Sequence, residues 1–497
     1  MPPFYRLLVA NRGEIAIRVI RACRELGISP IAVHSDADVD SLHVRMADAS
    51  ERIGPPAATE SYLSIDAVIA AALRSGAQAI HPGYGFLSEH AGFARAVEAA
   101  GLVFIGPPPA TLESLGNKLA ARRAAEAAGV PIVPGTTVAI EDEHADLDAI
   151  GFPLMLKAAA GGGGRGMRRV EQESEVGDLL AAARREALAA FGDGTIYVER
   201  LVAPARHVEV QLLGDRHGAL AVLGERDCSV QRRHQKLVEE SPSPAVDAVT
   251  RAHLFDSARR VAGAVEFHNA ATVEFLVDAD RNHFFLEMNT RLQVEHGVTD
   301  MVTGLDLVAW QIRVAAGEPL PERVLNAVGR GHAIEVRLYA EDPYNDFRPS
   351  AGRVTTWQMP AGPGVRVDAG VEAGTDLRPE YDPLLAKLLV HAEDRATAVH
   401  RLRRALDETL IGGLQTDAGF LRWLVDDDAF VSGAYDTGLI GDRWRAGLEL
   451  APSDAALAAT AALAARDASS APPARPEPAG RDGSAWGRLA RIEALRE

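Results

Sequence analysis

Two glutamates in the second half of the chain have a spacing that could hold a metal ion. Glu274 lies in T-V-E-F-L and Glu287 in F-F-L-E-M-N, with the turn-forming residues D-A-D-R-N between them. If these segments form a β-hairpin centred between Asp280 and Arg281, the two carboxylates face each other with Cβ atoms about 5 Å apart. Such carboxylates repel unless one is protonated or a divalent cation bridges them. With Asn289 on the same face, the spacing predicts Mg²⁺ or Mn²⁺ holding nucleotide phosphates.

Polar residues alternate along the chain from the second glutamate onwards. If this segment is extended, its odd positions point to one face beside the metal pair. That arrangement predicts that these polar side chains line one side of an active site. The alternative for both features, a solvent-exposed sheet face, is disfavoured by the apolar residues around the two glutamates. The polar members are Glu287, Asn289, Arg291, Gln293 and Glu295.

A glycine-rich loop, G-G-G-G-R-G at 161–166, lies between expected strands at 153–157 and 167–170. Glycines let backbone N–H groups converge on a phosphate without obstruction by Cβ atoms. Lys157, four residues before the loop, favours a phosphate site over the alternative of a flexible turn. The loop is neither a Walker motif nor a dinucleotide fingerprint, because no helix follows it.

The densest basic cluster is R-D-C-S-V-Q-R-R-H-Q-K at 226–236. Nucleic-acid binding is one interpretation, but the cluster lacks interleaved aromatic residues and the chain is acidic. A phosphate or bicarbonate site is the better hypothesis. Cys228 is expected to be a packed thiol rather than a nucleophile.

Composition limits the classes of protein to consider. The 497 residues carry a net charge of −17, so neither nucleic acid nor an anionic membrane is an expected partner. We find no apolar run long enough to span a membrane, no secretion signal and only two cysteines, which predicts a cytoplasmic protein. Lysine occurs only at Lys118, Lys157, Lys236 and Lys387, which suggests positions that need a compact ammonium group.

The expected elements divide the chain into regions of different type. Strands and helices alternate to about residue 113, which predicts a parallel α/β domain. A smaller unit with one Ala-rich helix follows, and long strands are expected after residue 204. An Ala- and Pro-rich tail begins after residue 450. In the first region we expect strands at 6–12, 31–34 and 77–80, and helices from Gly13, near 61–74 and at 91–99. Later strands are expected at 205–213, 219–225, 271–277 and 284–289.

With these motifs the chain resembles the biotin carboxylase family of ATP-grasp enzymes, from residue 10 to about residue 440. The segments that carry the resemblance are A-N-R-G-E-I-A, H-P-G-Y-G-F-L-S-E (81–89), K-A-A-A-G-G-G-G-R-G-M (157–167), E-R-D-C-S-V-Q-R-R-H-Q-K (225–236), E-M-N-T-R-L-Q-V-E-H (287–296) and R-L-Y-A-E-D-P.

The resemblance implies an α/β and α+β multidomain fold. Its parts are an N-terminal parallel α/β domain at 1–114, an ATP-grasp domain at 115–330 with a mobile lid at about 131–203, and a C-terminal mixed α/β domain at 331–446. Residues 447–497 form a tail or linker.

The resemblance also implies a nucleotide site. Lys118 and Lys157 contact the phosphates, and the glycine loop closes over them through Gly162, Gly163, Gly164 and Gly166. The other implied nucleotide residues are Glu199 and Leu201 at the adenine, His207, Gln231 and His234 near the ribose and phosphates, and Leu276. The implied ligands of two Mg²⁺ or Mn²⁺ ions are Glu274, Glu287 and Asn289.

The implied chemistry is ATP-dependent carboxylation of biotin by bicarbonate. Glu295 removes the bicarbonate proton, bicarbonate attacks the γ-phosphate of ATP, and carboxyphosphate forms and breaks down to CO₂ and phosphate. That phosphate takes the ureido proton of biotin, and Arg337, near Tyr84, stabilises the resulting enolate. The implied bicarbonate ligands are Lys236, Arg291, Gln293 and Val294.

The implied partners are a biotin carboxyl carrier protein or domain, a carboxyltransferase subunit and a second copy in a homodimer. The reaction would be the first half-reaction of an acyl-CoA carboxylase, with the final acceptor undetermined. Gly297, where proline is usual, favours the alternative of a urea-type carboxylase. Another ATP-grasp ligase, such as a carbamoyl-phosphate synthetase, and a non-catalytic nucleotide-sensing module are further alternatives.

The lysines bear on where biotin is attached. None lies in the A-M-K-M setting typical of biotin attachment, and three are assigned to phosphate or bicarbonate. We therefore expect biotin to come from a separate carrier or from a C-terminal region outside this chain. Lys387 receives no role from the sequence.

Overall fold

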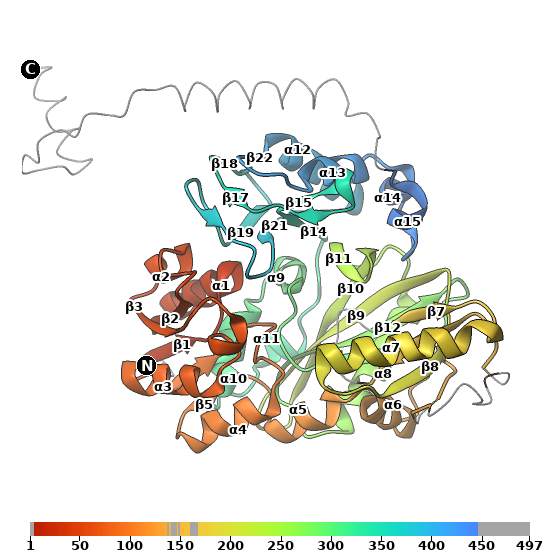
Figure 1. Cartoon of the computed structure of the whole chain (residues 1–497), viewed down its shortest axis with the longest axis horizontal. Coiled ribbons are helices and arrows are strands. Elements are labelled where there is room, and N and C mark those ends of the chain that lie inside the picture. The colour runs from red at the N-terminus through yellow and green to blue at the C-terminus, as the bar shows by residue number, and fades with distance from the viewer. Residues whose placement is uncertain (1–3, 137–138, 141–146, 148–149, 160–166, 446–497) are drawn as a thin grey trace, which may run out of the picture. The chain divides into compact units, whose positions relative to one another are not determined.

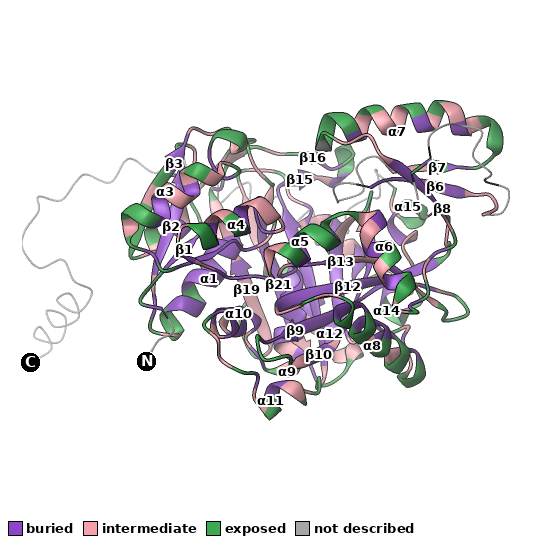
Figure 2. Cartoon of the chain, turned by 90° about the horizontal axis from the view of Figure 1, so that it is seen from below, coloured by how far each residue is buried: buried purple, intermediate pink, exposed green. Residues whose placement is uncertain are grey.

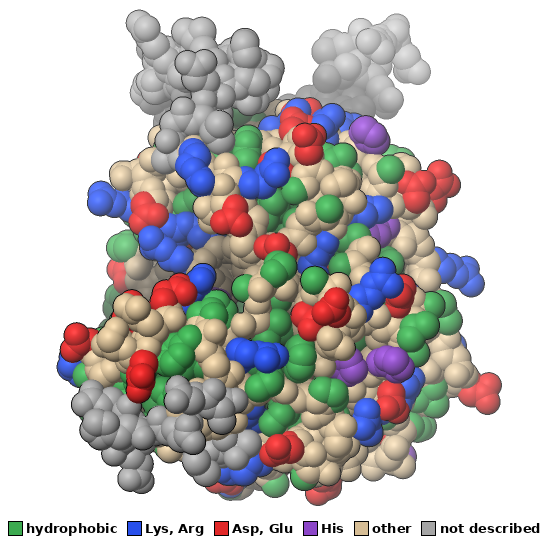
Figure 3. Space-filling view, turned by 90° about the vertical axis from the view of Figure 1, so that its right-hand side faces the viewer, with side chains coloured by type: hydrophobic (Ala, Val, Ile, Leu, Met, Phe, Trp, Pro, Cys, Tyr) green, Lys and Arg blue, Asp and Glu red, His purple; other side chains and the backbone are tan. Residues whose placement is uncertain are grey.

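The computed structural model describes residues 4–136, 139–140, 147, 150–159 and 167–445. The described residues belong to one compact unit (Figure 1). Within the described ranges, no helix combines the length and the apolar character that crossing a membrane requires. On the described part of the face in Figure 3, basic and acidic side chains are intermixed.

The N-terminal region is the expected parallel α/β structure. Its five strands are parallel in the order β3-β2-β1-β4-β5, and their apolar side chains pack against helices that connect them. The helix over Ala91–Ala99 has the predicted bounds. The strands are β1 (Arg6–Val9), β2 (Ser29–Ser35), β3 (Ala49–Gly54), β4 (Ala79–His81) and β5 (Val103–Phe104), and the helices are α1 (Gly13–Glu25), α2 (Leu42–Met46), α3 (Ile65–Ser75), α4 (Ala91–Ala99), α5 (Pro109–Gly116) and α6 (Lys118–Ala127).

A small antiparallel sheet carries the two strands expected to flank the glycine loop. β6 (Leu154–Ala158) lies between β7 (Arg168–Val170) and β8 (Ile196–Arg200). The Ala-rich helix α7 (Val176–Phe191) packs on this sheet through its small apolar side chains. The predicted hairpin strands are therefore present, whereas loop residues 160–166 lie outside the described residues.

An eight-stranded antiparallel sheet forms the centre of the unit. Its order is β13-β12-β9-β10-β11-β14-β21-β19, so it continues from the middle of the chain into the C-terminal region through the β11–β14 pairing. β10 is longer than expected and includes most of the basic cluster. The strands are β9 (Ala205–Gly214), β10 (Leu220–Arg232), β11 (Gln235–Ser241), β12 (Asn269–Asp278), β13 (His283–Asn289), β14 (His332–Tyr339), β19 (Val365–Ala369) and β21 (Leu384–Ala392).

Helices cover this sheet, and most of its strand residues are buried (Figure 2). Apolar residues of α8 pack against β9 and β12, and those of α12 pack against β14 and β21. The helices are α8 (Ala248–Gly263), α9 (His296–Thr303), α10 (Leu307–Ala315), α11 (Glu322–Leu325), α12 (Arg395–Glu408), α13 (Ala418–Leu424), α14 (Asp428–Ser432) and α15 (Leu439–Arg443). The remaining short strands pair as β15 (Glu341–Asp342) with β16 (Arg348–Pro349), β17 (Gly352–Arg353) with β20 (Asp376–Leu377), and β18 (Thr356–Gln358) with β22 (Leu410–Gly412).

Candidate active site

One row of charged side chains crosses four strands of the large sheet. Glu287 on β13 pairs with Glu274 on β12, which pairs with Glu209 on β9. Glu209 in turn pairs with Arg226 on β10. Directly opposed residues of neighbouring strands point to the same face, so these four side chains stand side by side. The predicted facing of Glu274 and Glu287 is confirmed.

The hairpin has this register at the glutamate pair, but its turn differs from the predicted one. On the turn side of the glutamate pair, Phe275 pairs with Phe285 rather than with Leu286. β13 therefore accommodates one extra residue at a bulge. The expected symmetric turn is wrong. The pairing of Glu274 with Glu287 is nonetheless right, because the bulge lies between the turn and this pair and its extra residue shifts β13 into the predicted register.

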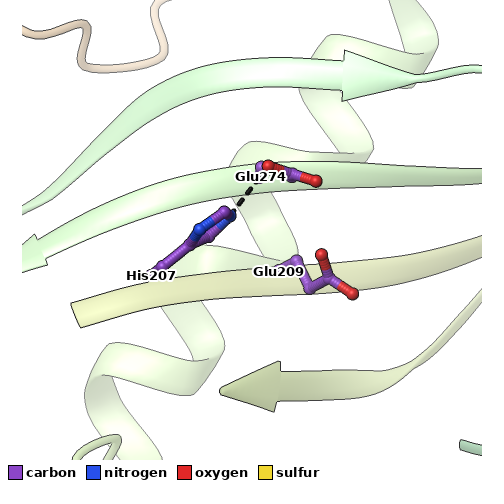
Figure 4. Close-up of side chains that lie close together, drawn as sticks. All are labelled: His207, Glu209 and Glu274. Atoms are coloured by element: carbon purple, nitrogen blue, oxygen red, sulfur yellow. Dashed lines mark hydrogen bonds and ion pairs between the residues drawn. The ribbon is translucent and has the colours of Figure 1, made fainter. Parts of the chain in front are cut away.

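Cationic and neutral donors surround Glu274. Its Oε2 lies 2.7 Å from His207 Nε2 (Figure 4). Its Oε1 accepts from Lys236 Nζ at 3.0 Å. Burial would raise the pKa of Glu274, but Lys236 and His207 outweigh it and hold the pKa well below its usual value. His207, Glu209 and Glu274 also bring one potential metal-ligand atom each to within 4.8 Å of one another.

Lys118 neutralises the second glutamate of the pair. Lys118 is the first residue of α6, and the Asn117 side chain caps this helix by accepting a hydrogen bond from the backbone N–H of Ala120. The Nζ of Lys118 lies 2.5 Å from Glu287 Oε2. Burial opposes ionisation of Glu287, but Lys118 lowers the pKa of this carboxyl nonetheless. Both members of the facing pair are therefore ionised at neutral pH.

A second buried cluster lies on the small sheet. Glu199 on β8 accepts from Arg122 of α6 at 2.6 Å and also from Lys157 of β6. The resemblance placed Lys157 at phosphate and Glu199 at adenine, and the structure brings the two side chains together. This contact leaves Lys157 anchored on a strand next to the glycine loop.

The alternating polar residues converge, but not along an extended strand. β13 ends at Asn289, so the expectation that the segment stays extended to Glu295 is wrong. Arg291 donates to Gln293 Oε1 at 2.9 Å and to Asn289 Oδ1 at 3.3 Å. Gln293 donates to Glu274 Oε1 at 3.1 Å. Hydrogen bonds between side chains therefore join this segment to the glutamate row after the strand has ended.

Glu295 ends that segment directly before helix α9. Its Oε1 lies 2.7 Å from Lys236 Nζ, and its Oε2 accepts from Arg337 at 2.9 Å. Arg337 also forms an ion pair with Glu239 at 2.5 Å. Burial would raise the pKa of Glu295, but Lys236 and Arg337 hold it well below the usual value. This carboxylate is therefore ionised and fully buried, with two cations at its oxygens.

The donor set of the glutamate pair fits a hard divalent cation. Opposed carboxylates of Glu274 and Glu287, with the Asn289 amide 2.9 Å from Glu274, offer the oxygen ligands that Mg²⁺ and Mn²⁺ prefer. Lys118 and Lys236 supply the positive charge that these carboxylates need. A bound cation would share the same oxygens with the two ammonium groups.

Other predicted residues lie at the edge of this centre. Gln231 pairs with Lys236 across the β10–β11 hairpin, whose turn holds His234 at φ 67°. Burial lowers the pKa of His234, which keeps the imidazole neutral. Leu276 pairs with His207 on β9.

Three more predicted residues fall on connecting segments. The Tyr84 hydroxyl donates to buried Glu14, and Leu201 directly follows β8. The carbonyl oxygen of Val294 accepts a hydrogen bond from Lys387 at 2.6 Å. The predicted loop residues that lie outside the described part of the chain are Gly162, Gly163, Gly164 and Gly166.

Several site residues were not predicted, although most of them lie in sequence patterns that could have identified them. Glu209 and Gln211 continue, at alternate positions of β9, the series that begins at His207, and alternation is also the pattern that identified the polar residues from Glu287 to Glu295. Arg226 is fully buried and donates to both Glu209 and Gln211. Glu89, which ends the motif H-P-G-Y-G-F-L-S-E, pairs with Arg291 at 2.9 Å.

Models of three known domains match consecutive parts of the chain. They are "Biotin carboxylase, N-terminal domain" over residues 3–112, "Carbamoyl-phosphate synthase L chain, ATP binding domain" over 117–323, and "Biotin carboxylase C-terminal domain" over 335–442.

Curated relatives and solved structures cover most of the same range. A biotin carboxylase of Halalkalibacterium halodurans is 48% identical over 440 residues, which cover 88% of this chain and 97% of the relative. The propionyl-CoA carboxylase alpha chain of Homo sapiens is 46% identical, with 90% of this chain and 62% of the relative covered.

Two solved structures have the same fold. A Campylobacter jejuni biotin carboxylase–β-γ-ATP complex is 44% identical, with a TM-score of 0.86 over 88% of this chain and 99% of that one. The biotin carboxylase domain dimer of Hydrogenobacter thermophilus 2-oxoglutarate carboxylase, with MgADP and bicarbonate, is 42% identical at a TM-score of 0.86 over 88% and 97%. The chain belongs to the biotin carboxylase family of ATP-dependent ligases.

Proposed function

We propose that the chain carboxylates biotin on a carrier protein, with bicarbonate and ATP as the other substrates. The observation that carries the proposal is the position of Glu295, a buried carboxylate that contacts both Lys236 and Arg337. Lys236 also contacts Glu274 of the facing pair. One lysine thus links the proposed base to the proposed phosphate site.

The residues around Glu295 are suited to activating bicarbonate. Lys236 and Arg291 attract the anion, and Glu295 accepts its proton while the bicarbonate oxygen attacks the γ-phosphate of ATP. The pKa of Glu295 is low without substrate because Lys236 and Arg337 stabilise its ionised form. A bound anion shares that positive charge, which makes Glu295 more basic when the proton must move.

The nucleotide is held from the opposite side of the glutamate row. Lys118 and Lys157 exchange their carboxylate partners for phosphate oxygens, and the glycine loop contributes backbone N–H groups. Glu274, Glu287 and Asn289 hold Mg²⁺ or Mn²⁺, which when bound neutralises the phosphates and orients the γ-phosphate.

Arg337 and Tyr84 serve the second step, at biotin. As the ureido nitrogen loses its proton, negative charge develops on the ureido oxygen, and the Arg337 guanidinium is the cation available to stabilise it. The dimer of the H. thermophilus relative supports a homodimer here. The acyl-CoA carboxylase alpha chains among the relatives support a carrier and a carboxyltransferase as partners.

The test is ATP hydrolysis measured with and without bicarbonate and free biotin. We expect hydrolysis to require bicarbonate and Mg²⁺ and to accelerate with biotin. A rate that depends on ammonia, as expected of a carbamoyl-phosphate synthetase, would contradict the proposal. Nucleotide binding without turnover would instead indicate a sensing module.

The close packing around residue 297 explains why a glycine lies at this position. A Cβ atom at this position would lie 2.3 Å from Leu389 Cδ2 and 3.0 Å from Glu335 Oε2. This packing gives the glycine a structural reason that is independent of the acceptor. The acceptor is decided by the carboxyltransferase partner, so co-purification with that partner identifies it.

A further inference from the structure

Lys387 is the lysine to which the sequence assigned no role. It lies in the middle of β21, and its side chain is fully buried. Its Nζ donates to the carbonyl oxygen of Val294 at 2.6 Å and lies 3.4 Å from Glu14 Oε1. The chain has 52 basic residues of which only four are lysines, so a fully buried lysine is an unusual choice for this chain.

The contact with Val294 fixes the peptide that leads into Glu295. This peptide is trans, so its C=O and N–H groups point in opposite directions. When Lys387 holds the carbonyl, the amide of Glu295 is directed away from β21. On the neighbouring strand, Arg337 pairs with Lys387 in register and holds the Glu295 side chain. β21 therefore holds the carbonyl of the peptide bond that precedes Glu295, and β14 holds the Glu295 carboxylate.

The second contact of Lys387, with Glu14, connects it to Tyr84, which is expected to lie near biotin. Glu14 of helix α1 is buried and accepts a hydrogen bond from the Tyr84 hydroxyl. Lys387 thus touches the segment before Glu295 with one hydrogen bond and the partner of Tyr84 with an ion pair. A compact ammonium group can serve both acceptors in a space where no solvent enters.

Burial raises the pKa of Glu14, but Glu14 remains the main counterion of Lys387, whose charge opposes that rise. Glu335 faces it, but burial raises the pKa of that carboxyl well above the usual value, and neither of its oxygens accepts a hydrogen bond from the described residues. Asp368 is already paired with Arg366 at 2.7 Å. The other titratable group nearby, His296, is kept neutral because burial lowers its pKa.

We propose that Lys387 is a positioning residue that sets the affinity for bicarbonate, because it holds the Val294–Glu295 peptide in place from the C-terminal region and ties it to Glu14 and Tyr84. This inference rests on the proposed function. It assigns Lys387 no contact with substrate. Its role is to fix the backbone beside the proposed base.

The test removes the hydrogen bond while keeping the buried charge balanced. Lys387→Met alone leaves Glu14 as an uncompensated buried charge and can destabilise the fold. The double variant Lys387→Met/Glu14→Gln removes both charges, and the amide oxygen of the introduced glutamine can still accept from Tyr84. Bicarbonate-dependent ATP hydrolysis then gives separate KM values for bicarbonate and ATP, and thermal unfolding reports stability.

We expect the double variant to raise the bicarbonate KM about tenfold or more, the effect of losing one hydrogen bond from a charged donor, while the ATP KM stays within about twofold. A matched control is Arg251→Met/Glu225→Gln, which removes another pair with a buried carboxylate, joined at 2.7 Å between α8 and β10. This control should leave both KM values unchanged.

A wild-type bicarbonate KM in the folded double variant overturns the inference, because Lys387 would then serve only to neutralise Glu14. Equal increases in both KM values also overturn it, since they indicate a general loss of structure. If the wild-type chain itself shows no bicarbonate-dependent hydrolysis, the proposed function fails instead. The two failures are therefore distinguishable.

Discussion

At the scale of single residues, the site concentrates carboxylates that would repel one another without nearby cations. Glu209, Glu274 and Glu287 are neighbours in one row, and each contacts a cation: Arg226, Lys236 and Lys118 respectively. Lys236 lies between Glu209, Glu274 and Glu295, with contacts of 2.6, 3.0 and 2.7 Å. Anionic substrates can enter because these cations can exchange a carboxylate for a substrate oxygen.

Glu295→Gln tests the proposed base. Glutamine keeps the shape and can still accept from Arg337, but it cannot take a proton. We expect ATP binding to persist and bicarbonate-dependent ATP cleavage to fall by at least about 100-fold, the usual scale for a general base. Steady-state hydrolysis and nucleotide titration measure the two properties. Near-normal turnover would remove Glu295 from this role.

Glu287→Gln tests the facing pair as a metal site. One of two opposed carboxylates is lost, so we expect the Mg²⁺ concentration needed for half-maximal activity to rise about tenfold or more. A titration of activity with Mg²⁺ at fixed ATP measures this. Glu186→Gln is the control, because it changes a half-exposed glutamate that pairs with Arg168 on β7, in the small antiparallel sheet. An unchanged Mg²⁺ titration of Glu287→Gln contradicts the assignment.

At the scale of elements, periodicity predicted the strands and helices well, but not what lies between them. The facing of Glu274 and Glu287 followed from alternation along two strands, whereas the bulge beside them depends on packing that alternation does not encode. The alternating polar residues from Glu287 to Glu295 were predicted to share one extended strand. The strand instead ends at Asn289, and side-chain hydrogen bonds hold the residues after it close to the glutamate row. Long-range pairings such as β11 with β14 leave no local signal.

A buried carboxylate joins several elements of the C-terminal region. Glu240 on β11 contacts His332 on β14 at 2.5 Å and Arg395 on α12 at 2.7 Å, and it accepts from Tyr435. Burial would raise its pKa, but the hydrogen bonds from His332 and Arg395 lower it to about 2. Because the folded pKa lies below the unfolded one, Glu240 stabilises the fold above about pH 4.5, and this contribution is lost as the pH falls towards 2.

Glu240→Gln should therefore destabilise the chain most at neutral pH. The shift corresponds to about 3 kcal/mol at pH 7. We expect the difference in thermal stability between wild type and variant to be largest at pH 7 and to shrink towards pH 3. Unfolding followed by circular dichroism at a series of pH values measures it. A difference that does not change with pH contradicts the assignment of the low pKa.

At the scale of the whole molecule, three regions contribute to one centre. Glu89 comes from the N-terminal region and the glutamate row from the middle strands, and Arg337 comes from a strand of the C-terminal region. The continuous eight-stranded sheet holds the last two together. A site assembled in this way depends on all three regions being folded, which is why the motifs predicted the facing pair within one hairpin but not the contacts between regions.

The same assembly predicts that the chain does not carry biotin itself. Biotin is attached to an accessible lysine, and the four lysines, Lys118, Lys157, Lys236 and Lys387, have side-chain exposures of only 21%, 8%, 13% and 0%. Each of them also contacts a carboxylate, so attachment would break a buried ion pair. After co-expression with an active biotin ligase, a streptavidin blot should show no signal at the mass of this chain. Activity should then depend on free biotin or on an added biotinylated carrier, whereas a biotinylated band at 52.9 kDa would contradict the prediction.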